Sequence, residues 1–436
     1  MLQAGATEVC ITPPIGVELA GYGFRLKRHS TDVHDPLMAQ ALVLDDGERR
    51  VALITSDLIT IAPTFTEVVR RDIEKRAHIP PDHVMVSCAH SHTAPTTVAF
   101  RELGDPDPGY VRMAARQMAG AVVASVGKLQ PAHLSVGRGE HSRLAWNRVG
   151  AGDVDPTVEV ARVDAADGAP LALLVYYACH PVILGPKRTI SADYPGALRR
   201  HLQRQYPGVI LFANGACGDI DPATNREVWG QGTFADVDNE GAALAASAWA
   251  AAQQATLVAD ARLRVRWEAL RLRYDVPTLA AVREQIARYR AEARASGRRS
   301  ERFSRVTDTG GVARFWLGYY RALERRLLAG AQPDHEEIAL QAFLVGGALA
   351  MVAIPGELFT AEGRLIRRRS AYPHTLPICY SNGAYGYFPP RAQFEQGGYA
   401  AILAAACHDR PPFQPDVAEA VVEAALRTLG PEFPPG

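Results

Sequence analysis

The sequence has no excess of either charge, few lysines and no long, strongly apolar run. Its 47 basic residues balance 47 acidic residues, so no net field attracts nucleic acid or an anionic membrane surface. Only four of the basic residues are lysine. Together with the abundant alanine, this preference for arginine indicates a bias in genomic composition, and we read no function from it. We expect no nucleic-acid partner.

The six cysteines are scattered and form no C-x-x-C pair. Four of them lie in apolar runs, which is typical of free, buried cysteines. The first residues also lack the basic segment and the apolar stretch of a signal peptide. Both observations favour a reducing, cytoplasmic location.

Two uncharged stretches could be mistaken for membrane spans. The first, residues 241–259, is mostly alanine with serine and glutamine and is too weakly hydrophobic to span a bilayer. The second, residues 338–356, is divided by Gly346 and Gly347 into two strand-sized halves. We therefore expect a soluble protein without stable membrane insertion.

A recurring unit consists of two apolar strands joined by a tight turn and followed by a polar residue. The three copies end at Asp57, His180 and Glu357. Their turns contain the hairpin-forming pairs Asp-Gly at 46–47, Asp-Gly at 167–168 and Gly-Gly at 346–347. The three copies share a layout, and we infer no common ancestry from it.

Further apolar runs predict buried strands at 83–90, 209–215 and 375–383. Helical periodicity is present near 64–77, 110–127, 193–205, 236–256, 359–370 and 416–429. Strands that alternate with helices predict an α/β fold with layers of flanking helices around mixed β-sheet. We expect one domain over residues 1–436.

The segment 276–331 differs from its surroundings because it is rich in arginine and alanine and helical in pattern. We interpret it as a helical hairpin inserted on the surface, with its arginines on solvated faces. A lid over the active site and a contact in a homo-oligomer are the alternatives.

Polar residues follow directly on the ends of the predicted core strands. His90, His180 and Glu357 do so, as do Asn-Gly pairs at 214–215 and 382–383. In α/β sheets, ligand crevices form at the carboxyl ends of the strands. Each residue alone fits a structural role, but together they predict a site.

The chemistry of these side chains suits a metal ion. Two neutral imidazoles and a carboxylate are a common ligand set for catalytic zinc. Zinc lowers the pKa of a bound water towards about 7 and polarises a scissile carbonyl. Manganese and iron also accept histidine and carboxylate ligands and remain alternatives. In His90-Ser91-His92, an extended chain would point both imidazoles the same way, so His92 is a second ligand or a neighbour over the substrate.

The glycine-rich loop NGACGDIDP at 214–222 does not suit a phosphate. It lacks the G-K-[ST] sequence, and the carboxylates of Asp219 and Asp221 would repel the anion. A turn beside a metal site fits better. Cys217 in this loop is an alternative nucleophile, with His90 or His92 as its base.

These motifs, in this order, resemble the catalytic domain of the neutral and alkaline (non-lysosomal) ceramidases. AHSHTAP is similar to the family's T-H-T-H-S-G-P and implies that His90 binds zinc. YYACHPV and IPGELFT resemble the segments that supply the next two ligands, here His180 and Glu357. SNGAYGY resembles N-x-Y-x-x-Y, and aligning Asn382 with its Asn gives Tyr387 as the fourth ligand. The resemblance implies one zinc ion per chain.

The same resemblance implies further catalytic residues. It places His92 beside the substrate carbonyl. AWNRVG resembles the family's N-R-S-P, whose arginine, here Arg148, contacts the substrate or the oxyanion. Tyr399, twelve residues after Tyr387, falls where the family has a second active-site tyrosine. These groups would stabilise the oxyanion or protonate the leaving amine.

One position departs from the family. Its G-D-V-S-P loop carries an essential serine, but residues 218–222 here read G-D-I-D-P, with Asp221 in the serine position. A carboxylate cannot act as an alkoxide-type nucleophile. It can orient or deprotonate a metal-bound water, so Asp221 is the candidate general base.

We therefore predict a zinc-dependent hydrolase that cleaves an amide (N-acyl) bond by metal-activated water. The chain ends at Gly436 without the family's C-terminal immunoglobulin-like domain and without its secretion signal, so we expect a soluble, acyl-containing small molecule as substrate. A zinc-dependent esterase or lactonase and an N-acyl-sugar deacetylase are alternatives. A non-catalytic binding protein is a further one.

Overall fold

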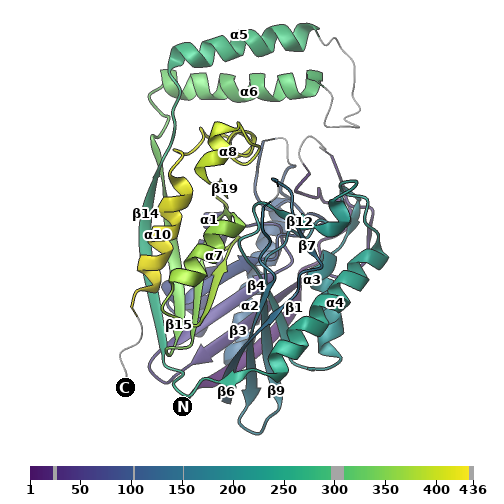
Figure 1. The fold of residues 1–436 in the computed structure, drawn as a ribbon, viewed down its shortest axis with the longest axis vertical. Helices are drawn as coiled ribbons and strands as arrows, with labels where there is room; N and C mark the ends of the chain where they lie inside the picture. The colour runs from purple at the N-terminus through teal and green to yellow at the C-terminus, as the bar shows by residue number, and fades with distance from the viewer. Residues whose placement is uncertain (23–26, 102–103, 151, 296–308, 432–436) are drawn as a thin grey trace.

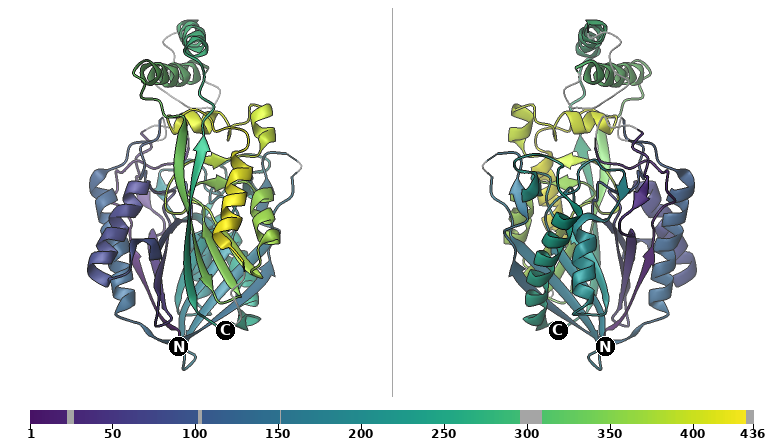
Figure 2. Two further views of the ribbon diagram at one scale, coloured as in Figure 1. Left: turned by 90° about the vertical axis from the view of Figure 1, so that its left-hand side faces the viewer. Right: turned by 90° about the vertical axis from the view of Figure 1, so that its right-hand side faces the viewer.

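Two β-sheets lie face to face and helices cover both outer sides (Figures 1 and 2). The computed structural model describes residues 1–22, 27–101, 104–150, 152–295 and 309–431. The larger sheet has nine strands, in the order β11-β9-β8-β6-β1-β3-β4-β5 with β13 beside β6, and the smaller has four, in the order β14-β15-β16-β18. The prediction of a layered α/β fold with mixed sheets is confirmed.

The bounds of the strands in the larger sheet are β1 Gln3–Cys10, β3 Met38–Asp45, β4 Arg50–Ser56, β5 Val84–Cys88, β6 Gln130–Glu140, β8 Thr157–Ala165, β9 Pro170–Tyr177, β11 Val209–Asn214 and β13 Thr256–Leu257. The smaller sheet contains β14 Leu263–Arg273, β15 His335–Val345, β16 Leu349–Ala353 and β18 His374–Ile378. Short pairs are formed by β2 Asp32–Val33 with β10 Thr189–Ile190, β7 Ala145–Asn147 with β12 Ile220–Pro222, and β17 Glu357–Leu358 with β19 Tyr387–Phe388.

The helices are α1 Pro63–Ala77, α2 Pro108–Val126, α3 Asp193–Gln203, α4 Phe234–Gln253, α5 Leu279–Ala295, α6 Thr309–Leu328, α7 Thr360–Arg369, α8 Arg391–Glu395, α9 Leu403–Cys407 and α10 Val417–Leu429. Helices α2 to α4 pack on the larger sheet, α1 packs on α2, and α7 and α10 pack on the smaller sheet. No helix in these described ranges combines the length and apolar character that a membrane crossing needs.

The three predicted hairpins are present as β3–β4, β8–β9 and β15–β16. Their turn residues Gly47, Gly168 and Gly346 have φ angles of 95°, 87° and 52°. This left-handed backbone is accessible to glycine at little steric cost. The glycines that predict these turns therefore also permit the backbone conformation that the turns require.

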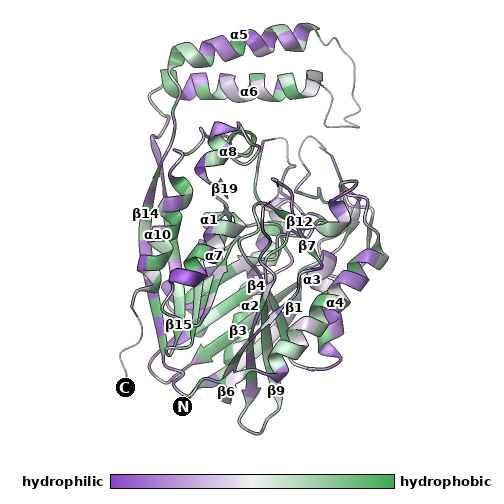
Figure 3. Ribbon diagram, viewed as in Figure 1, coloured by the Kyte–Doolittle hydropathy of each residue, from purple (hydrophilic) through white to green (hydrophobic). Residues whose placement is uncertain are grey.

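The core between the two sheets is apolar. Leu42, Leu53 and Leu174 of the larger sheet belong to one buried cluster with Phe343 and Met351 of the smaller sheet. The strands are accordingly mostly hydrophobic in Figure 3, whereas α5 is largely hydrophilic. Burial of these side chains, at about 25 cal/mol per Å² of apolar surface, holds the layers together.

Helices α5 and α6 form a pair at the end of the molecule opposite the termini (Figure 1). They lie in the segment 276–331, where the sequence predicts an inserted helical hairpin. Phe315 and Leu323 of α6 pack in one buried cluster with Ala406 and Cys407 of α9. The pair therefore rests on α9, which lines a cavity described below.

The edges of the larger sheet meet on one segment after β18. Strand β5 lies at one edge and β11 at the other. The amide of Cys88 donates to the carbonyl of Tyr380 at 3.1 Å, and the amide of Cys379 donates to the carbonyl of Asn214 at 3.0 Å. This closure brings together strand ends that are far apart in the sequence.

A buried ion pair fixes the end of β4 to α3. Both guanidinium nitrogens of Arg199 donate to the carboxylate of Asp57, one of them at 2.6 Å. Asp57 also accepts the amide of Met38 at 2.7 Å. Because both charged side chains are almost fully buried, each depends on the other for its stability.

Replacement of Arg199 by methionine should destabilise the protein strongly, because it leaves the Asp57 carboxylate buried and unpaired. We expect denaturant titration to show a loss of about 3–5 kcal/mol in the free energy of unfolding. Arg143→Met breaks the more exposed pair with Glu240 and should cost at most about 1 kcal/mol. Equal losses in the two variants would contradict this account.

Candidate metal centre

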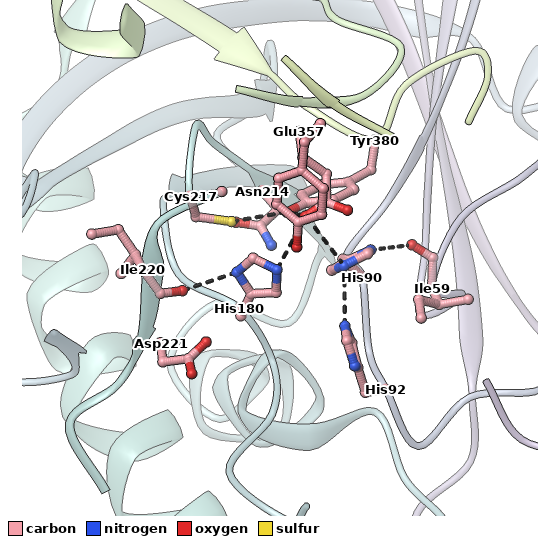
Figure 4. A network of polar contacts seen from close by, with 12 residues as sticks. Ile59, His90, His92, His180, Asn214, Cys217, Ile220, Asp221, Glu357 and Tyr380 are labelled. Carbon is pink, nitrogen blue, oxygen red and sulfur yellow. Dashed lines mark hydrogen bonds and ion pairs between the residues drawn. The ribbon is translucent and has the colours of Figure 1, made fainter. Parts of the chain in front are cut away.

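Three buried side chains from separate segments converge at the closed sheet edge (Figure 4). His90 follows β5, His180 follows β9 and Glu357 begins β17. Glu357 Oε2 lies 3.2 Å from His180 Nε2 and 3.8 Å from His90 Nε2. His180 is 0% exposed and His90 is 5% exposed. The expectation that these strand ends share one place is confirmed.

Main-chain carbonyls orient both imidazoles. His90 Nδ1 lies 2.6 Å from the carbonyl oxygen of Ile59, and His180 Nδ1 lies 2.9 Å from that of Ile220. A carbonyl can only accept, so each Nδ1 carries the proton and each Nε2 presents a lone pair. The buried Nε2 of His180 has no hydrogen-bond partner. This arrangement is typical of histidines prepared to bind a metal ion.

One amide side chain aligns the two histidine segments. Asn214 Nδ2 donates to the carbonyl of Ala89 at 2.9 Å and to that of Cys179 at 3.1 Å. These are the residues directly before His90 and His180. Asn214 is fully buried, so its hydrogen bonds do not compete with water. The Asn-Gly pair at 214–215 therefore has a definite role in building the site.

The fourth predicted ligand is next to the third. Strands β17 and β19 are parallel, and their register pairs Glu357 with Tyr387. Glu357 lies in the short strand β17 and not in the helix that follows it, since α7 begins only at Thr360. The cause is the pairing with β19, which is distant in sequence. The Tyr380 hydroxyl also donates to Glu357 Oε2 at 3.2 Å.

His92 belongs to the same cluster, since its Nε2 lies 3.1 Å from His90 Nε2. His90, His92 and His180 could together hold a metal ion. The predicted extended chain is wrong at His90, whose φ is 74°, but the two imidazoles still meet. Gly21 makes room for His92, because a Cβ there would lie 2.4 Å from the His92 ring.

The candidate base, Asp221, is held at both carboxylate oxygens. Arg148 Nη1 donates to Oδ1 and Trp229 Nε1 donates to Oδ2, both at 3.1 Å. Arg148 also donates to the Tyr387 hydroxyl at 3.0 Å. Figure 4 shows Asp221 beside His180. Sequence reasoning missed Trp229, which lies in an irregular segment without a motif.

A cavity of about 70 Å³ adjoins this cluster, and we call it the inner cavity. His90, His92, Glu357, Tyr387 and Tyr399 are among the residues that line it. The Tyr399 ring lies 5.8 Å from the Tyr387 ring, centroid to centroid. Tyr399 is 54% exposed, which places it at the mouth. Of the other predicted site residues, His180 and Arg148 contact the lining residues Glu357 and Tyr387, and Asp221 contacts Arg148.

Burial shifts the pKa values of these groups. It lowers the pKa of His90 to about 4 against the opposing effect of Glu357, and it lowers that of His92 well below the usual range. For Glu357, burial raises the pKa, but the His90 and His180 imidazoles and the Tyr387 hydroxyl outweigh it and hold the pKa at about 2. At neutral pH, His90 and His92 are neutral beside an ionised carboxylate.

Cys217 is poorly suited to be a nucleophile. Its sulfur is fully buried and lies 3.2 Å from the Tyr380 hydroxyl and 3.5 Å from Asn214 Oδ1. Burial raises the pKa of the thiol well above its usual value. A protonated, inaccessible thiol does not attack a substrate.

The donor atoms fit a divalent cation. Two imidazole lone pairs and a carboxylate oxygen converge in a space shielded from water, where like partial charges repel one another. A zinc ion would satisfy all three and, with Tyr387 adjacent, complete four coordination. The chemistry of this donor set is therefore consistent with the predicted cofactor.

Comparison with solved structures shows the fold. The neutral ceramidase from Pseudomonas aeruginosa matches with a TM-score of 0.75 and 17% sequence identity, over 98% of this chain and 74% of that chain. A structure of a ceramidase complexed with C2 gives a TM-score of 0.75 at 16% identity with the same coverage. No protein-family model matches the sequence. This protein therefore has a ceramidase-like fold over nearly its whole described length.

Asn214→Ala should weaken metal binding, because it removes the two hydrogen bonds that align the residues before His90 and His180. We expect the zinc affinity to fall about 10- to 100-fold in a competition titration with a chromogenic chelator. Asn225 is also buried and donates to Val182, so Asn225→Ala is the matched control and should leave the affinity near that of wild type. An equal loss of zinc affinity in the two variants would show that Asn214 does not align the metal-binding residues.

In the metal-free protein, the free energy of unfolding should fall as the pH is lowered from about 6.5, the pKa of an unfolded histidine. Folded His90 has a pKa of about 4, so between about pH 6.5 and pH 4 the unfolded state binds more protons than the folded state. The contribution of His90 to the free energy of unfolding is therefore lost over this range. Urea titrations at several pH values in this range should show that the free energy of unfolding changes less steeply with pH in His90→Gln than in wild type. An unchanged dependence on pH would contradict a depressed pKa of His90.

Proposed function

We propose that this protein is a zinc-dependent hydrolase that cleaves the amide bond of N-acyl compounds, with one zinc ion per chain. The observation that carries the proposal is the convergence of His90 Nε2, His180 Nε2 and Glu357 Oε2 within a buried cluster. The ceramidase-like fold supports the choice of an amide bond, since the similar solved proteins are named ceramidases.

We propose His90, His180, Glu357 and Tyr387 as the zinc ligands. Bound there, zinc would supply Lewis acidity, which polarises a carbonyl group and makes water more acidic. The depressed pKa of His90 keeps its imidazole neutral and able to bind a cation at neutral pH. The carboxylate of Glu357 offsets part of the positive charge.

Asp221 is proposed to accept the proton of the attacking water. Arg148 and Trp229 hold its two oxygens, so the carboxylate is oriented before the substrate binds, which reduces the reorganisation needed in the reaction. The same Arg148 contacts the Tyr387 hydroxyl and remains charged. It therefore offers positive charge to an oxyanion that develops nearby.

His92 and Tyr399 are proposed to contact the reacting amide from the inner cavity. His92 has a buried Nδ1 without a hydrogen-bond partner, so its ring still has a polar group to offer. The Tyr399 ring lies beside that of Tyr387, and Tyr399 lines the inner cavity. Either group is placed to hydrogen-bond the oxyanion or to protonate the leaving amine.

The proposed catalytic unit spans residues 1–436, with 276–331 as an insertion within it. The substrate is proposed to be a soluble, acyl-containing small molecule. The inner cavity has a volume of about 70 Å³. It accommodates only part of a substrate beside the proposed metal ligands, and the rest of the substrate must extend beyond it.

Metal dependence separates this proposal from thiol chemistry. The purified protein should release amine from N-hexanoyl amides. A strong chelator should abolish this activity and added zinc should restore it, because the ligands hold the ion reversibly. A thiol alkylating agent should have no effect on buried Cys217. Activity that survives chelation but not alkylation would refute the metal mechanism.

Asp221→Asn should separate metal binding from turnover, because asparagine keeps the shape of the side chain but lacks the basic carboxylate. We expect kcat to fall about 10²- to 10⁴-fold with an unchanged zinc content by elemental analysis. Trp229→Phe removes only the hydrogen bond to Oδ2 and should have a smaller effect. An unchanged kcat in Asp221→Asn would exclude Asp221 as the base.

A further inference from the structure

A larger cavity of about 400 Å³ adjoins the inner cavity, and we call it the outer chamber. Phe100, Ala384 and His408 line both spaces. The rings of Phe100 and His408 lie 4.4 Å apart, centroid to centroid, and form part of this shared wall. The inner cavity and the outer chamber are therefore separated by a single layer of side chains.

The outer chamber is lined by charged residues, unlike the site of an alkyl chain. Arg326, Glu336, Asp409 and Arg410 all line it. Asp409 forms ion pairs with Arg101 at 2.8 Å and with Arg326 at 3.3 Å. Glu336 accepts a hydrogen bond from the Tyr274 hydroxyl.

Among the described residues that line the chamber, Glu336 forms no ion pair, and neither does Arg410. Its guanidinium stacks on the Phe413 ring at 4.4 Å from the centroid, and its buried Nε has no hydrogen-bond partner. Burial lowers the pKa of Arg410, although Tyr274 and Glu336 oppose the shift. The Tyr274 hydroxyl, which is hydrogen-bonded to Arg410, and the Glu336 carboxylate therefore compensate this charge only in part. A partly compensated buried charge is costly, and such groups are usually paired.

Arg410 is also close to the metal centre. A Cβ placed on Gly386 would lie 2.9 Å from Arg410 Nη2 and 2.9 Å from His408 Nε2. The carbonyl of the same Gly386 accepts the amide of Glu357 at 2.8 Å. One glycine therefore separates this guanidinium from the backbone of a proposed metal ligand. The φ of Gly386 is 70°, which glycine adopts at little cost.

We propose that Arg410 binds an anionic group of the substrate in the outer chamber, so that the enzyme prefers N-acyl amides that carry a carboxylate or a phosphate on one side of the scissile bond. The planar guanidinium matches both anions through paired hydrogen bonds. This inference rests on the proposed amidase function. Water adds to the amide carbon and the carbon–nitrogen bond breaks, giving a carboxylic acid and an amine, and the anionic group is unchanged.

The test compares matched substrates. N-hexanoyl-β-alanine and N-hexanoylethanolamine phosphate carry the anion on the amine side, N-propyladipamic acid carries it on the acyl side, and N-hexanoyl-β-alaninamide is neutral. For wild type, kcat/KM should be at least about tenfold higher for one anionic substrate than for the neutral one, which corresponds to about 1.4 kcal/mol. The phosphate and carboxylate substrates identify which anion is preferred.

Arg410→Gln should abolish this preference by raising KM for the anionic substrates, and Arg410→Lys should retain part of the preference. Arg143, which is remote in sequence and pairs with Glu240, provides the control Arg143→Gln, which should keep the preference. Should Arg410→Gln fail to fold, Ala384→Leu provides a second test. The larger side chain fills space between the inner cavity and the outer chamber and leaves the charge of Arg410 in place. This variant should lower kcat/KM for the preferred anionic substrate more than for the neutral one.

Calorimetry separates this inference from the proposed function. Zinc-free wild type should bind N-hexanoyl-β-alanine or the phosphate more tightly than the neutral amide. Hydrolysis without any charge preference would overturn the anion site and leave the amidase proposal intact. Charge-selective binding without hydrolysis of any substrate would refute the amidase proposal and leave the anion site intact.

Discussion

The site depends on two hydrogen bonds from imidazole to main chain. His90 and His180 each direct Nδ1 at a carbonyl oxygen, of Ile59 and Ile220 respectively. This fixes the tautomer of each ring and directs both Nε2 lone pairs at the carboxylate of Glu357. Because the cluster is shielded from water, the lone pairs have no solvent partner. We propose that this enforced proximity gives the cluster its affinity for a cation.

The fold supplies that proximity through closure of the larger sheet. Its edge strands β5 and β11 both contact the segment after β18, so strand ends that are distant in sequence meet. Asn214 then joins the two histidine segments through their carbonyls, and the β17–β19 register places Tyr387 beside Glu357. Of the four proposed ligands, His90 and His180 therefore lie just after strands, and Glu357 and Tyr387 lie in the short β17–β19 pair.

Much of this could be predicted from the sequence. Apolar runs joined by glycine-containing turns predict the hairpins, and polar residues directly after buried strands predict a site at His90, His180 and Glu357. The geometry of His90 and the β17 strand could not be predicted, because both arise from pairing with distant segments. Trp229 and Arg410 carry no local signal. Their importance lies in the hydrogen bond to Asp221 and in the lack of an ion-pair partner, which only the tertiary structure reveals.

The central claim is that His90, His180, Glu357 and Tyr387 hold one zinc ion. A crystal of the zinc-loaded protein, measured at the zinc absorption edge, tests this most directly. The account predicts one anomalous peak per chain, with the Nε2 atoms of both histidines and oxygens of Glu357 and Tyr387 at about 2.0–2.2 Å. A peak elsewhere, no peak, or a zinc ion held by His92 with Tyr387 remote would contradict it.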